Sequence, residues 1–188
     1  MSLNVQTTKF ESAVLEHLDA GHNLARWLLR NEQDAQDVVQ ESCVKALRAF
    51  DTFRGGDFRV WFLTIIRNTS FTWMRRNRNP GGHGVTQDVD AGPDIAADAH
   101  AYDPLAIAIR AADAHRVRRA IEALPDSLRE TLVLREMEGL SYKEIGNIVD
   151  VPIGTVMSRL ARGRAILHNL LVEMDQSLPH KSVQEGAP

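Results

Sequence analysis

The chain of 188 residues has very little cysteine, since Cys43 is the only one. Without a second thiol no disulfide can form within the chain, which suits a reducing compartment. No apolar run approaches the ~20 residues that a membrane-spanning helix needs. The N-terminal segment also lacks the basic start and apolar stretch of a secretory signal. We therefore expect a cytoplasmic protein without membrane insertion.

A strong net charge is lacking as well. The sequence has 22 Lys and Arg against 25 Asp and Glu, for a formal net charge of −3. The overall charge therefore does not indicate nucleic-acid binding, and the distribution of charge along the chain matters more. Aromatic residues make up only 6% of the chain, so an aromatic side chain among polar residues of a helix stands out.

The motifs of enzymes and metal proteins are missing too. The seven histidines are scattered and none forms HExxH, and no second cysteine exists to build a zinc site. Neither a phosphate-binding glycine loop nor a nucleophile elbow is present. We therefore expect no enzyme, no catalytic residue, no metal and no cofactor. Elemental analysis would test the alternative of a metal protein.

What the sequence does have is two helical blocks around a segment of different composition. Helical periodicity covers residues 10–78 and returns at 105–172, and no β-alternation of useful length occurs. The segment between them is rich in Gly, Pro, Asp and Ala and has no Lys or Arg, which is typical of a flexible acidic linker. The prediction is an all-α fold of two small helical domains, at residues 1–78 and 105–174, with a linker at 79–104 and a disordered tail at 175–188.

An amphipathic helix with an acidic face is predicted from Asp34 to Phe50. Its apolar face contains Val39, Cys43, Ala46 and Phe50 at helical spacing, and Cys43 is read there as a small buried hydrophobe. Asp34, Asp37 and Glu41 share another face. This acidic stripe is either an ordinary solvated surface or a docking face for a basic partner.

The next predicted helix begins after an N-cap at Asp57 and runs to Arg78. The face that suits burial contains Phe58, Phe62, Ile65, Ile66 and Thr69. A second face contains Trp61, Thr64, Asn68, Thr72 and Arg75. All charges after the cap are positive, at Arg59, Arg67, Arg75, Arg76 and Arg78.

The second face of this helix indicates a surface for single-stranded DNA. Aromatic rings stack on unpaired bases, amides and hydroxyls read base edges, and arginines hold phosphates. The alternative is that Trp61 belongs to the core, as aromatic residues on helices more often do.

A helix-turn-helix is predicted in the second block. Ser141 and Glu144 form a capping box that starts a short helix, and Pro152 separates it from a longer helix from Ile153 to about Leu171. Val156, Leu160, Gly163, Leu167 and Leu170 form the buried stripe of the longer helix, and Thr155, Ser158, Arg159 and Arg162 project from the opposite side. Such a helix enters the major groove of DNA, although an ordinary helical hairpin is the alternative.

Both blocks together resemble the extracytoplasmic-function (ECF) group of bacterial sigma factors. Residues 34–78, DAQDVVQESCVKALRAFDTFRG followed by VWFLTIIRNTSFTWMRRNR after a short gap, resemble sigma domain two. Residues 124–167, LPDSLRETLVLREMEGLSYKEIGNIVDVPIGTVMSRLARGRAIL, resemble sigma domain four. The resemblance implies a factor that binds RNA polymerase core and directs promoter-specific transcription initiation.

The resemblance also implies a role for each surface. The acidic face would bind the clamp helices of the polymerase β′ subunit, domain four would meet the β flap, and the linker would thread the polymerase cleft. The −10 element would be recognised and melted by Trp61, Thr64, Asn68, Thr72, Arg75 and Arg76. The −35 element would be read by Thr155, Ser158, Arg159 and Arg162. Promoter DNA and polymerase are thus the expected partners, and an anti-sigma factor is a further one.

Three positions depart from the family pattern. Met157 stands where the family often has Lys or Arg, and Ala161 offers no large side chain to the bases. Asp150 occupies a turn position usually held by Gly, but Asp tolerates the left-handed conformation. These departures affect the promoter sequence that is read rather than the class of protein.

A free-standing regulator that binds duplex DNA unaided is the main alternative. It explains the helix-turn-helix but neither the acidic face nor the stripe around Trp61. A gel shift on duplex promoter DNA without polymerase separates the two, because a sigma factor should bind poorly alone.

Overall fold

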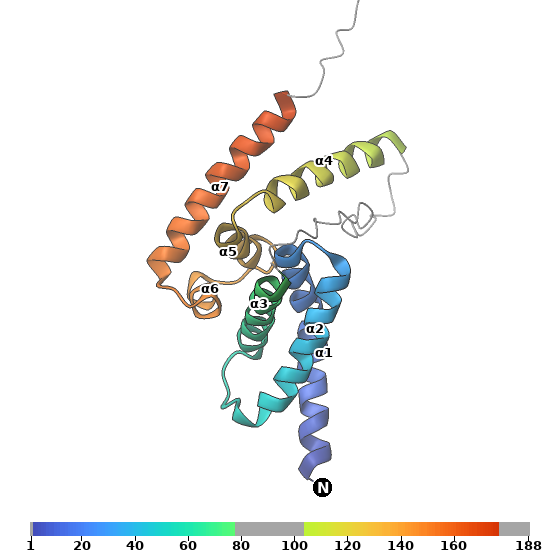
Figure 1. Cartoon of the computed structure of the whole chain (residues 1–188), viewed down its shortest axis with the longest axis vertical. Coiled ribbons are helices and arrows are strands. Elements are labelled where there is room, and N and C mark those ends of the chain that lie inside the picture. The colour runs from blue at the N-terminus through green and yellow to red at the C-terminus, as the bar shows by residue number, and fades with distance from the viewer. Residues whose placement is uncertain (1, 78–103, 177–188) are drawn as a thin grey trace, which may run out of the picture.

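The computed structural model describes residues 2–77 and 104–176 (Figure 1). These residues form helices without any strand, which confirms the all-α prediction. The helices are α1 (Ser2–Leu29), α2 (Glu32–Ala49), the short 3-10 helix η1 (Phe50–Thr52), α3 (Phe58–Asn77), α4 (Pro104–Glu122), α5 (Asp126–Glu136), α6 (Tyr142–Val149) and α7 (Ile153–Gln176).

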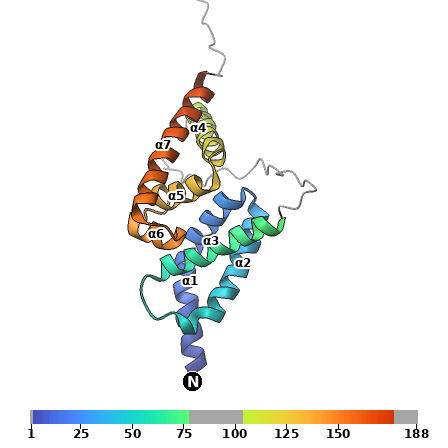
Figure 2. The ribbon, with the colours of Figure 1, turned by 60° about the vertical axis from the view of Figure 1, so that its left-hand side comes forward.

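Helices α1, α2 and α3 pack on one another and form the N-terminal bundle (Figure 2). The Asn31 side chain caps α2 by accepting a hydrogen bond from the backbone N–H of Asp34 at 2.9 Å. α1 and α3 approach closely at Gly21, where an added Cβ would lie 3.0 Å from the Phe62 ring and 3.3 Å from Ile66. A larger residue than glycine would therefore push these two helices apart.

Helices α4 to α7 form the C-terminal bundle, in which local sequence signals set the start and the end of α6. Ser141 and Glu144 form the expected capping box at the start of α6. Asp150 ends α6 in the left-handed conformation with φ 53°. The fully buried Arg129 guanidinium donates to the carbonyl oxygens of Glu122 and Leu124, and so ties α5 to the turn after α4.

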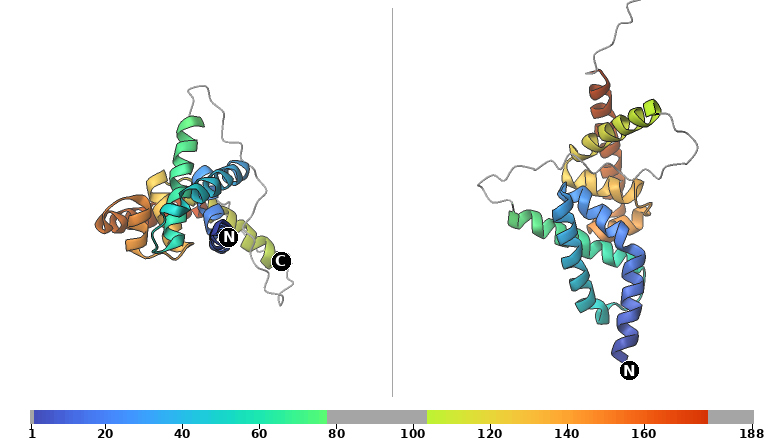
Figure 3. Two further views of the ribbon diagram at one scale, coloured as in Figure 1. Left: turned by 90° about the horizontal axis from the view of Figure 1, so that it is seen from below. Right: turned by 90° about the vertical axis from the view of Figure 1, so that its right-hand side faces the viewer.

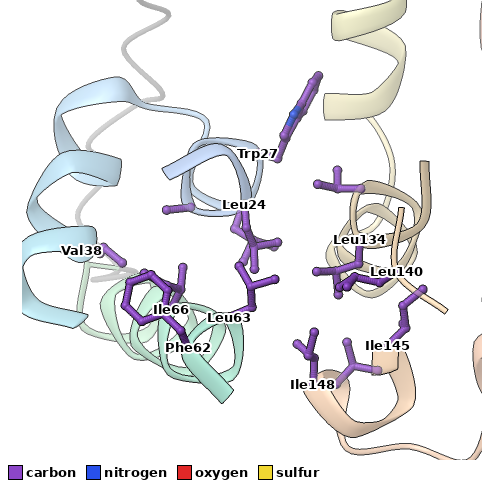
Figure 4. Packing of buried hydrophobic residues seen from close by; sticks show 14 of the residues in the cluster. Leu24, Trp27, Val38, Phe62, Leu63, Ile66, Leu134, Leu140, Ile145 and Ile148 are labelled. Atoms are coloured by element: carbon purple, nitrogen blue, oxygen red, sulfur yellow. The ribbon is translucent and has the colours of Figure 1, made fainter. Parts of the chain in front are cut away.

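The two bundles pack against each other, and their buried residues form one apolar cluster (Figure 4). α3 packs on α6, and α1 packs on α5. Leu63 and Ile66 of α3 thus belong to the same cluster as Leu134, Ile145 and Ile148 of the second bundle. Figure 3 shows α3 crossing beside the second bundle. The sequence predicted two domains but gave no sign that they share a core.

Helix boundaries differ slightly from the predicted ones. α4 begins at Pro104, which the sequence placed in the linker, and α7 continues to Gln176 rather than ending near Leu171. α1 begins at Ser2, earlier than the periodic block from residue 10. The remainder of the predicted linker, at 79–103, and the tail from 177 to 188 lie outside the described residues.

Candidate polymerase and promoter interfaces

The predicted acidic face lies on α2, and its three carboxylates are each half-buried. Glu41 forms an ion pair with Lys45 at 2.7 Å, and Lys45 also donates to the Thr69 hydroxyl of α3 at 3.2 Å. Through Lys45, the Glu41 carboxylate of the acidic face is therefore linked to the neighbouring helix α3.

Two apolar side chains accompany these acids on α2. Val44 and Leu47 are 48% and 50% exposed, and sequence reasoning did not single them out. A helix face with both acidic and exposed apolar residues is more typical of a protein-binding surface than of a face that only meets solvent.

Trp61 is half-buried rather than freely exposed. Its ring lies 5.1 Å from Phe53 and 5.4 Å from Phe58, measured between centroids. It also lines a pocket of about 610 Å³ whose other wall includes Ser141 and Lys143 at the start of α6. The indole is thus anchored by aromatic neighbours on one side and borders an open space on the other.

The polar residues that follow Trp61 on α3 are either half-buried or exposed. The hydroxyls of Thr64 and Thr72 donate to the carbonyl oxygens four residues earlier, at 2.8 and 2.9 Å. Asn68 is exposed, and its side-chain oxygen accepts a 3.3 Å hydrogen bond from Arg67. Arg75 and Arg76 are exposed at the end of the helix. These residues lie on one helix, as predicted, with the amide of Asn68 presented outward.

The predicted −35 residues lie at the start of α7, but they do not all point the same way. Ser158 and Arg162 are exposed, and Thr155 is half-buried. Arg159 instead reaches inward, where its Nη1 lies 3.3 Å from a carboxylate oxygen of Glu130 in α5. Exposed apolar residues, Ile153 and Met157, share the outer side of this helix.

Glu130 is the least exposed carboxylate that meets these helices, with its side chain 1% exposed. Arg67 of α3 donates to it through Nε at 2.9 Å. Burial raises the pKa of Glu130 above its ordinary value, while the hydrogen bond and charge of Arg67 and the charge of Arg159 oppose this rise. No pattern in the sequence marks Glu130 as a functional residue, because its partners lie in other helices.

Cys43 is half-buried on α2, and burial raises the pKa of its thiol. A raised pKa leaves less of the reactive thiolate at neutral pH. This does not favour a reactive thiol, although Cys43 is half-buried rather than buried as predicted.

Within the described ranges, no group of three or more His, Cys, Asp or Glu residues could hold a metal ion. None of the described helices combines the length and the apolar character that crossing a membrane requires.

Comparison with protein families assigns each bundle. Residues 13–79 match the Sigma-70 region 2 family, and residues 114–167 match the Sigma-70 region 4 family. The first match contains α2 and α3, and the second contains α6 and the first part of α7, to residue 167. The fold and these matches define a sigma factor with domains two and four.

Similar proteins of known class show to which group of sigma factors the chain belongs. The ECF RNA polymerase sigma-E factor of Haemophilus influenzae is 35% identical over 149 residues, which cover 78% of each chain. The sigma-E factor of Escherichia coli K12 is 37% identical over 142 residues, covering 72% of this chain and 73% of its own. The chain therefore belongs to the ECF group of RNA polymerase sigma factors, and it directs promoter-specific transcription initiation.

Solved structures show the same two-bundle arrangement. The sigma factor RpoE of Bartonella quintana, in complex with the anti-sigma factor NepR, is 26% identical with a TM-score of 0.69 and covers 87% of this chain and 97% of its own. CnrH in complex with the cytosolic domain of CnrY is 25% identical with a TM-score of 0.64, covering 89% and 90%. Each similarity thus extends over both bundles.

Proposed function

We propose that this sigma factor divides its task among three helices. Asp34, Asp37 and Glu41 of α2 bind the β′ clamp helices of polymerase. Trp61, Thr64, Asn68, Thr72, Arg75 and Arg76 of α3 capture the melted −10 element, and Thr155, Ser158, Arg159 and Arg162 of α7 read the −35 element. The observation that carries this proposal is the outward placement of Asn68 and Arg162 on separate basic helices, one within each family-matched segment.

The proposed domain division follows from the same helices. Domain two is residues 1–78, domain four is residues 105–174, and the acidic segment 79–104 connects them through the polymerase cleft. α4 begins at Pro104, one residue before this proposed start of domain four. The protein works in the cytoplasm.

In the proposed mechanism, the chain supplies promoter specificity but no catalytic group. Polymerase performs the phosphodiester chemistry. Domain four anchors the upstream duplex through α7 and meets the β flap, while domain two binds unpaired bases and so shifts the equilibrium from the closed to the open complex. Once polymerase holds both domains, each DNA contact raises the effective concentration of the other.

An anti-sigma factor is a further proposed partner. Two similar solved structures, of RpoE and CnrH, are complexes with NepR and with the cytosolic domain of CnrY. Their similarity covers both bundles, which supports an anti-sigma factor as a partner of this chain.

Transcription in vitro with purified core polymerase, with and without the chain, tests the proposal. We expect promoter-dependent transcripts only when the chain is present. Asn68→Ala should lower the yield of open complex while binding to core polymerase persists, because the amide reads an unpaired base. Asn77→Ala, an exposed asparagine at the end of the same helix, is the matched control. Equal open-complex yields for the two variants would refute the role of Asn68.

A further inference from the structure

Two exposed apolar residues, Ile153 and Met157, form an apolar edge at the start of α7. They are 47% and 54% exposed, and their spacing of four residues places them on the same side of the helix. Among the exposed large apolar residues of α7, Met157 has the greatest exposed fraction. A large apolar side chain so open to water at a DNA-binding helix indicates contact with a ligand rather than a role in packing.

The structure leaves this side of α7 uncovered. Figures 1 and 2 show α7 along the outside of the C-terminal bundle. A Cβ added at Gly154 would meet no atom from another helix of the described chain within 4 Å, and Ala161, one turn after Met157, is exposed. The residues through which α7 packs on its bundle lie on another side, at Val156, Leu160 and Gly163. A ligand can therefore approach the apolar edge directly.

Polar and basic side chains border the apolar edge. Ser158 and Arg162 are exposed, whereas Arg159 turns inward to Glu130 of α5. Met157 and Arg162 are about 7.5 Å apart along the helix axis, which is close to two base-pair steps of ~3.4 Å. A duplex that meets Arg162 in its major groove therefore also meets Met157, within about two base pairs.

The chemistry of Met157 restricts what it can recognise there. A thioether has no hydrogen-bond donor and is only a weak acceptor, so it cannot hold a phosphate or pair with the polar edge of a base. A Lys or Arg, which the family often has at this position, would bind phosphate instead. The one apolar group that base pairs present in the major groove is the 5-methyl group of thymine.

We propose that Met157, with Ile153 beside it, determines specificity for thymine in the −35 element through apolar contact with the thymine methyl group. The inference rests on the proposed function, because it requires α7 to lie in the major groove of that element. Arg162 and Ser158 then select bases by hydrogen bonds, and Met157 distinguishes thymine from cytosine and from uracil by the methyl group.

Selection from a pool of promoters with a randomised upstream region is the first test. Core polymerase carrying the wild-type chain should enrich thymine at one or two positions of the upstream element. Met157→Ala should lose this enrichment and keep the others, while Met157→Leu, which stays apolar, should retain it. Val172→Ala is the matched control, since Val172 is 40% exposed on α7 but lies about 22 Å further along the helix axis.

Replacement of the enriched thymines by deoxyuridine is the second test, because it removes only the methyl group. Wild-type holoenzyme should bind the substituted promoter about fourfold more weakly, which is the effect of burying one methyl group. Met157→Ala should bind both promoters equally, and about as weakly as wild type binds the uracil promoter. Deoxyuridine placed between the two promoter elements controls for a change in DNA stiffness.

Three results would overturn the inference. They are equal binding of wild type to the thymine and uracil promoters, undiminished discrimination by Met157→Ala, and weaker binding of Met157→Ala to core polymerase without DNA, which would assign the apolar edge to a protein partner. The wild-type comparison needs no variant, so it holds even if a substitution disturbs folding. The proposed function fails separately, when the wild-type selection enriches no upstream sequence at all.

Discussion

Each of the two basic helices of this sigma factor, α3 and α7, contains an arginine that pairs with a buried acid and at least one arginine that is exposed. On α3, Arg67 meets a buried acid while Arg75 and Arg76 are exposed. On α7, Arg159 reaches Glu130 while Arg162, one turn later, is exposed. A basic stripe therefore does not by itself define a DNA-binding surface. The acids of the neighbouring helix decide which arginines stay available for phosphates and bases.

The largest effect should come from the inward side of α7. Leu160 is 1% exposed and lies in the shared core, so Leu160→Ala should lower the free energy of unfolding by about 2–5 kcal/mol. Met157, on the outer side and 54% exposed, is the control, and Met157→Ala should change stability by less than about 0.5 kcal/mol. Urea denaturation measures both. Similar losses would show that the two sides of α7 are not distinguished as described.

The next largest effect is expected for Arg162, which is exposed on α7 whereas Arg159 is half-buried. Arg162→Ala should weaken use of the −35 element by about 1–3 kcal/mol if the guanidinium binds a base pair in the major groove. The measurement is binding of holoenzyme to promoters with native and scrambled upstream elements. An equal loss on both would assign Arg162 to the phosphate backbone instead.

Arg159→Ala sharpens the same comparison. Because Arg159 pairs with the buried Glu130 inside the C-terminal bundle, Arg159→Ala should lower the free energy of unfolding by about 1–3 kcal/mol. Arg162→Ala, at an exposed position, should change it by less than about 0.5 kcal/mol. Urea denaturation measures both, and equal losses would show that the inward and outward arginines do not differ as the structure indicates.

The smallest expected effect is the contribution of Glu130 to the pH dependence of folding stability. Its pKa is raised above 4.5, chiefly by burial and to a small extent by Asp126, against the lowering effects of Arg67 and Arg159. A carboxyl with a raised folded-state pKa stabilises the fold most below the unfolded pKa, and this contribution is lost as pH rises through the folded pKa. Glu130→Gln cannot ionise, so its stability relative to wild type should increase as pH rises from about 4.5.

Urea unfolding at a series of pH values between about 4 and 8 measures this difference. Glu136→Gln, which alters an exposed carboxylate of the same helix, controls for the change in net charge. A constant difference between Glu130→Gln and wild type over the whole range would contradict the raised pKa.

Much of the fold could be predicted because it depends on short-range chemistry. The cap at Asp57, whose carboxylate accepts from the Val60 N–H at 3.2 Å, and the left-handed turn at Asp150 involve residues close in sequence. The outward positions of Asn68 and Arg162 followed from helical periodicity. The inward turn of Arg159 did not, because its partner acid lies in another helix.

The sequence by itself determined the helices, the family and the helix faces on which the proposed DNA-binding residues lie, since each of these depends on neighbours within a few turns. Only the tertiary structure decided that the bundles close on one another. Arg59 pairs with Glu138, 79 positions away, and Arg67 pairs with Glu130, 63 positions away. Helical periodicity does not tell which elements on either side of a linker come into contact. The repeating charged and apolar positions around Leu63 and Leu134 can therefore be read from the sequence, but the contact between them cannot.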